Sequence, residues 1–158
     1  MINLPVSKSA WTKLILASVA LLMLACSTVE KVSATEIVMY KDPNCGCCGD
    51  WAKHLQAEGF TVTEKLSNEM ERVKAEYGVP AQLASCHTAI VDGYIIEGHV
   101  PADDIKRLLK ERPAVTGLTA PGMPMQSPGM QPSGLPPKGY DVLSFDKQGN
   151  SHVYHSYK

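Results

Sequence analysis

Four cysteines could bring metal or redox chemistry to this chain. Three of them, Cys45, Cys47 and Cys48, lie within four residues of one another, and the fourth, Cys86, directly precedes His87. Thiolates are soft ligands that select Cu(I), zinc or iron–sulfur clusters. Cys45 and Cys48 taken alone also have the C-x-x-C spacing that dithiol redox enzymes use. The sequence therefore predicts metal–thiolate chemistry or thiol–disulfide chemistry.

The adjacent thiols favour copper among the metals. Structural zinc sites typically use paired C-x-x-C units separated by a loop, and Cys47 with Cys48 would chelate one tetrahedral ion only with strain. The spacing typical of ferredoxins is absent. Adjacent thiolates suit the bridging of two metals, which indicates a multinuclear Cu(I)–thiolate site. The alternative without a metal is a structural disulfide between Cys45 and Cys48, with Cys47 a buried spectator.

Other side chains could add ligands to such a site. His99 follows a β-rich run, and Met123, Met125 and Met130 occur in a segment rich in proline and glycine. Thioether sulfur is soft and neutral, so a flexible loop could carry it to Cu(I). The competing interpretation is that these methionines only cover the core and that His99 is structural. His54 is expected on the solvated face of a helix.

The pattern of apolar residues predicts an α/β domain that positions the cysteines. The order is βαβαββα, as in a thioredoxin-like fold, with the cysteine cluster where the first strand meets the first helix. A helix N-terminus favours thiolate over thiol, and in this layout Cys86 lies beside the cluster. The expected elements are a strand over 36–40, a helix over 45–58, a strand over 60–66, a helix from 67 or 68 to 78, a hairpin of 87–91 and 94–97, a helix from 101, and a terminal hairpin of 140–145 and 152–157.

The segment over 113–139 differs in composition from the rest. It is rich in proline, glycine and methionine, so we expect no regular element in it. Its length is typical of a functional or covering loop more than of a connector.

The N-terminus resembles a secretory signal. Lys8 and Lys13 precede an apolar run over 14–25 that is too short to span a bilayer as a helix. Cleavage after Ala34 would leave a single domain over 35–158. Cleavage before Cys26, at a lipobox-like sequence, would leave a lipid-anchored protein instead. The predicted location is the bacterial periplasm, with Cys26 as the only means of contact with a membrane.

Charge excludes another class of partner. The formal net charge is −1 and no basic run follows the signal. Nucleic-acid binding therefore has no electrostatic support.

Four motifs in order give the chain a family resemblance. They are KDPNCGCC over 41–48, SCHTA over 85–89, GYIIEGHVP over 93–101 and the methionine loop over 122–130. Together they resemble the CopG-like periplasmic copper-resistance proteins, which are unrelated to the DNA-binding repressor of the same name. The resemblance implies a thioredoxin-like fold, a cysteine-bridged copper cluster and a role in copper tolerance.

The predicted function is that of an exported protein that holds Cu(I) in a thiolate cluster. Its expected partners are copper ions and envelope proteins that export or oxidise copper. The alternative is a thiol–disulfide or copper-redox oxidoreductase that uses the Cys45/Cys48 pair. Carried over by position, the family motifs give the metal ligands as Cys45, Cys47, Cys48, Cys86, His87, His99, Met123 and Met130.

Overall fold

The computed structural model describes residues 34–158. The predicted signal over 1–34, with Cys26, lies outside these residues except for Ala34, so both cleavage sites stay predictions. Within the described part of the chain, no helix is long and apolar enough to cross a membrane.

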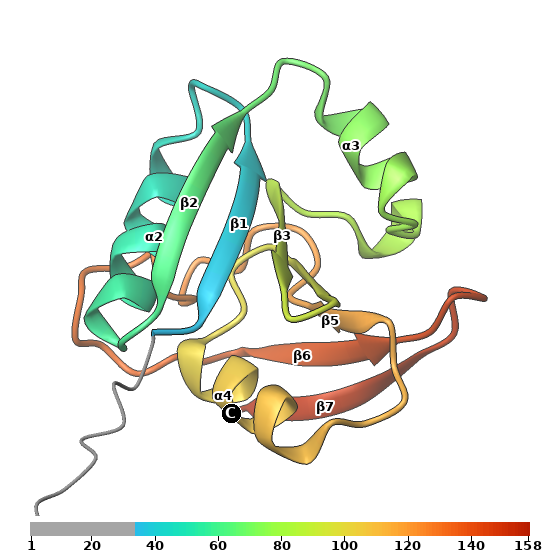
Figure 1. Cartoon of the computed structure of the whole chain (residues 1–158). Coiled ribbons are helices and arrows are strands. Elements are labelled where there is room, and N and C mark those ends of the chain that lie inside the picture. The colour runs from blue at the N-terminus through green and yellow to red at the C-terminus, as the bar shows by residue number, and fades with distance from the viewer. Residues whose placement is uncertain (1–33) are drawn as a thin grey trace, which may run out of the picture. The chain divides into compact units, whose positions relative to one another are not determined.

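A single mixed sheet of seven strands organises the described residues, in the order β2-β1-β3-β4-β5-β6-β7 (Figure 1). β1 runs parallel to β2 and antiparallel to β3, and β4 runs antiparallel to β3 and parallel to β5. β6 pairs antiparallel with both β5 and β7. The strands are β1 (Glu36–Lys41), β2 (Thr61–Leu66), β3 (His87–Val91), β4 (Tyr94–Glu97), β5 (Gly117–Thr119), β6 (Tyr140–Phe145) and β7 (Ser151–Tyr157).

Among residues 34–158, three α-helices accompany the sheet. In the view of Figure 1, α2 lies to the left of the β1–β2 pair and α3 to its right. The order of elements from β1 to α4 confirms the predicted βαβαββα pattern and is compatible with a thioredoxin-like arrangement. The turn of the β3–β4 hairpin is Asp92-Gly93, and both residues have positive φ. The helices are α2 (Gly46–Ala57), α3 (Met70–Glu76) and α4 (Ala102–Glu111), with a short 3-10 turn, η1 (Ala81–Leu83).

Two expectations about the elements were wrong. The helix expected from residue 67 or 68 begins only at Met70, because the Ser67 hydroxyl accepts a hydrogen bond from the Glu69 backbone N–H in the preceding turn. The segment over 113–139 was expected to hold no regular element, yet it contains β5. β5 is only three residues long and is stabilised by pairing with β4 on one side and β6 on the other.

The buried face of α2 places the cysteine cluster against the core. Cys48, Trp51, Ala52 and Leu55 are buried at i, i+3, i+4 and i+7, as expected for one face of a helix. Trp51 is fully buried, and its indole N–H donates to the Val100 carbonyl at 2.9 Å. The N-terminal turn of α2 is thereby held next to the chain that leaves β4.

Candidate metal centre

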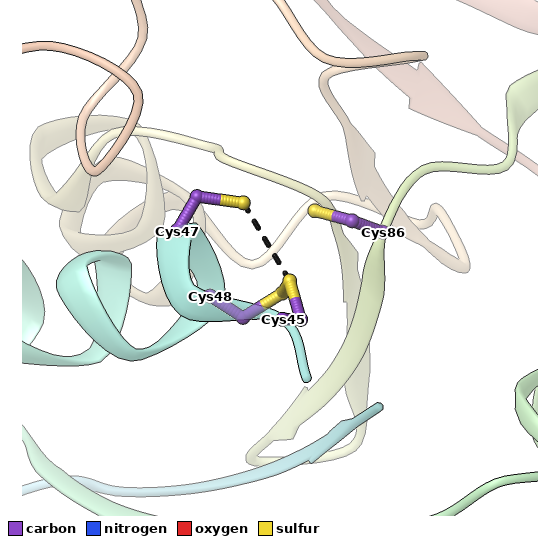
Figure 2. Close-up of side chains that lie close together, drawn as sticks. All are labelled: Cys45, Cys47, Cys48 and Cys86. Atoms are coloured by element: carbon purple, nitrogen blue, oxygen red, sulfur yellow. Dashed lines mark hydrogen bonds between the residues drawn. A yellow bond between two sulfur atoms is a disulfide. The ribbon is translucent and has the colours of Figure 1, made fainter. Parts of the chain in front are cut away.

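The sulfur atoms of Cys45, Cys47, Cys48 and Cys86 lie within 4.8 Å of one another. Cys45 is the N-cap of α2, and Cys47 and Cys48 are in its first turn. Cys86 comes from the segment that leads into β3, and its sulfur points toward the other three (Figure 2). The fold therefore brings together the four cysteines that the sequence predicts as ligands. No side chain caps the N-terminus of α2.

Two of these cysteines form a disulfide, Cys45–Cys48, while Cys47 and Cys86 are free. Cys47 is half-buried and its sulfur lies 3.5 Å from that of Cys45. The disulfide is the one that the sequence offered as an alternative to a metal site, but Cys47 is not a buried spectator. In this oxidised form the centre presents two thiols, and reduction would present four.

Two histidines extend the cluster toward the core. Cys48, Cys86, His87 and His99 form a second group whose ligand atoms lie within 4.8 Å of one another. The Cys86 sulfur is 3.1 Å from Nε2 of His99 and 3.5 Å from Nδ1 of His87. His87 is fully buried and its Nε2 has no hydrogen-bond partner among the described residues. A buried nitrogen without a partner is costly, and Nδ1 is the His87 nitrogen that faces the Cys86 sulfur.

A backbone carbonyl sets the tautomer of His99. Nδ1 of His99 lies 2.6 Å from the carbonyl oxygen of Pro128, which can only accept, so Nδ1 carries the proton. Nε2 therefore keeps its lone pair and faces the Cys86 sulfur. Metal-binding histidines typically have their second nitrogen fixed in this way.

Burial determines the protonation states in the metal-free centre. It lowers the pKa of His87 well below the usual value, with a further contribution from His99, and it also lowers the pKa of His99. Both imidazoles are thus neutral, as metal ligands must be. Burial, together with the neighbouring Cys47, raises the pKa of Cys86 to about 11. A metal that binds Cys86 must therefore displace its proton.

The loop over 113–139 covers part of the centre. Gly129 packs so closely on α2 that a Cβ there would lie 2.6 Å from the Trp51 nitrogen and 2.9 Å from the Cys47 oxygen. Met130, next to it, is half-buried, whereas 59% of Met123 and 70% of Met125 are exposed. The roles of Met123 and Met130 as metal ligands stay predictions.

The expectation that His54 lies on a solvated helix face was wrong, and sequence reasoning also missed Lys41, a polar side chain next to the cysteine cluster. His54 is half-buried, and its Nε2 accepts a hydrogen bond from the Ala102 N–H at the start of α4. The Lys41 ammonium is nearly buried and donates to the Cys45 carbonyl at 3.1 Å, next to the cysteine cluster. A lysine at the end of a β-rich run carries no signal of burial, and only the position of Lys41 beside the cysteine motif could have pointed to it.

The donor set fits copper better than it fits a hard cation. Thiolate and neutral imidazole are ligands for Cu(I), Cu(II) and zinc, whereas magnesium and calcium need oxygen. Neither of the two groups contains a carboxylate.

Comparison with known proteins identifies the family. Residues 83–130 match a family model described as a protein of unknown function, DUF411, and a search of curated proteins gave no match. A solved structure titled "Copper resistance protein copG- Form 2" is 43% identical, with a TM-score of 0.73, over 80% of this chain and 100% of that one. Form 1 of that protein is also 43% identical, with a TM-score of 0.72, over 79% and 98%. Since this identity extends over nearly all of the described residues, the chain belongs to the family of CopG copper resistance proteins.

Proposed function

We propose that this protein binds Cu(I) in a multinuclear thiolate cluster formed by Cys45, Cys47, Cys48 and Cys86. The observation that carries the proposal is the approach of the four sulfur atoms to within 4.8 Å of one another. Each sulfur can bridge two ions, so four cysteines can hold several copper ions, and soft thiolates prefer Cu(I).

Reduction must precede the loading of this cluster. The Cys45–Cys48 disulfide takes up two electrons and two protons from a dithiol, which is itself oxidised to a disulfide, and two thiols result. Copper ions then displace the protons of the four thiols. His99 and His87 lie beside Cys86 and are the nitrogen ligands that we propose for the inner side of the cluster.

We place this activity in copper tolerance in the bacterial periplasm, after export directed by residues 1–34. The two similar structures are titled copper resistance proteins, which supports the tolerance role. The proteins that would give copper to this chain or take it away are envelope proteins that export or oxidise copper.

Anaerobic titration of the reduced protein with Cu(I) tests the proposal. We expect more than one copper per chain and retention of copper in the presence of excess zinc. Cys86→Ser should sharply reduce copper uptake while the circular dichroism spectrum stays unchanged, because a ligand is lost but the side-chain volume barely changes. Binding of a single zinc ion that Cu(I) does not displace would refute the multinuclear copper cluster.

A second candidate function is that of a thiol–disulfide oxidoreductase. It is favoured by the Cys45–Cys48 disulfide at the N-terminus of α2, with the free Cys47 sulfur 3.5 Å from that of Cys45. Copper in the proposed cluster would occupy the same sulfurs, so we expect negligible insulin reduction by the copper-loaded protein and slow reduction by the metal-free form. Activity of the loaded protein close to that of a thioredoxin control would favour the enzyme.

A further inference from the structure

A buried polar network lies behind the cysteine that completes the cluster. Glu97, at the end of β4, is fully buried, and Lys74 of α3 is nearly so. The Lys74 ammonium donates to Glu97 Oε1 at 2.6 Å and to the Thr88 hydroxyl at 3.2 Å. The Thr88 hydroxyl donates to Glu97 Oε2 at 2.6 Å.

The same carboxylate holds the backbone beside Cys86. The Ser85 N–H donates to Glu97 Oε1 at 2.6 Å. Ser85 also bonds through its hydroxyl to the Gly122 carbonyl, and β4 continues into Gly98, where a Cβ would lie 2.5 Å from the Cβ of Ser85. Ser85 is therefore held from two sides, and Cys86 is the next residue.

We propose that Glu97 is a positioning residue for the metal centre, which fixes Cys86 in the cluster through the Ser85 N–H. Cys86 lies on a short stretch between η1 and β3, outside any regular element. Its sulfur lies 3.9 Å from the Ser85 hydroxyl, 3.5 Å from Nδ1 of His87 and 3.1 Å from Nε2 of His99, beside the other three cysteine sulfurs. The bond from Ser85 to Glu97 is thus a strong tether for the one cysteine that α2 does not carry. Lys74 neutralises the buried carboxylate. The tether itself needs only the oxygen of Glu97 that accepts from the Ser85 N–H.

Two double variants separate the tether from the ion pair. Lys74→Met with Glu97→Gln removes both charges but keeps an amide oxygen that can accept from the Ser85 N–H. Lys74→Met with Glu97→Leu removes the charges and the acceptor. Replacing a buried ion pair with apolar side chains of similar size often leaves stability unchanged, so urea denaturation and circular dichroism should find both variants folded.

The first readout needs no metal. Cys47 and Cys86 are the free thiols of the described form, and their alkylation by iodoacetamide can be followed separately by peptide mass spectrometry. Loss of one buried hydrogen bond should raise the alkylation rate of Cys86 about tenfold in the leucine variant, while Cys47 serves as the internal control. The glutamine variant should stay within about twofold of wild type, since its acceptor is retained.

The second readout rests on the proposed function. In competition with a chromophoric Cu(I) chelator, the leucine variant should hold its weakest copper about tenfold less tightly than wild type, and the glutamine variant should match wild type. Failure of the wild-type protein to bind Cu(I) would refute the proposed function but leave the alkylation test of Glu97 intact.

Two results would overturn the positioning role. In one, Cys86 of the leucine variant is alkylated at the wild-type rate and the variant binds copper with wild-type affinity. In the other, the glutamine variant shows the same rise in Cys86 alkylation and the same loss of copper affinity as the leucine variant. This result would assign the effect to the ion pair. If the leucine variant does not fold, hydrogen exchange of the wild-type Ser85 amide decides instead. We expect protection close to that of β3 amides, and rapid exchange would overturn the tether.

Discussion

Substitution of Gly129 should separate the loop that covers the centre from α2. Gly129 has a φ of +85°, and a Cβ there would lie 2.6 Å from the backbone nitrogen of Trp51. For Gly129→Ala the left-handed conformation costs about 1–2 kcal/mol. Crowding against the helix backbone, which cannot rotate away, adds roughly 1–3 kcal/mol. The free energy of unfolding should therefore fall by about 2–5 kcal/mol, the sum of these two contributions.

Gly134→Ala is the matched control for this prediction. Gly134 lies in the same loop with the same φ of +85°, but a Cβ there would meet nothing within 4 Å. The free energy of unfolding of Gly134→Ala should fall only by the conformational contribution, about 1–2 kcal/mol. Urea and thermal denaturation resolve the difference, because about 1 kcal/mol shifts the midpoint of a domain of this size by roughly 3–6 °C. Equal losses in the two variants would show that the loop does not pack on α2.

Two further predictions concern pH and membrane anchoring. The metal-free protein should lose stability as the pH falls below 6.5, the ordinary histidine pKa, because burial lowers the pKa of His87 and His99 in the folded state. The unfolded chain then binds protons that the native state does not. The free energy of unfolding therefore falls by up to about 1.4 kcal/mol per pH unit for each histidine. Urea midpoints that rise on acidification would contradict this prediction. If Cys26 is lipidated, Cys26→Ala should move the protein from the detergent-extracted membrane fraction to the soluble periplasm, whereas a mature N-terminus at Thr35 would show ordinary secretion.

Local sequence patterns were enough to predict most elements near the centre. The two runs 87–91 and 94–97 around Asp92-Gly93 predicted the β3–β4 hairpin at its observed bounds, because this dipeptide adopts the positive φ values that a tight turn requires. The spacing of Cys48, Trp51 and Leu55 predicted the buried face of α2. Residue type alone indicated soft-metal or redox chemistry for the cysteines, and the motifs around them indicated the family, which the comparisons confirm.

Contacts between residues far apart in the chain decided the rest. β5 is too short to form by its own propensity, and it exists because β4 and β6 pair with both of its edges. His54 and Lys74 are of residue types that usually lie at the surface. Yet His54 Nε2 accepts a hydrogen bond from the Ala102 N–H, and Lys74 neutralises the buried Glu97. Sequence patterns report which face of an element is apolar, but the partner of a buried polar atom depends on which other element packs there. The sequence thus predicted which cysteines and histidines lie together at the candidate centre, while their hydrogen-bond partners and tautomers followed only from tertiary packing.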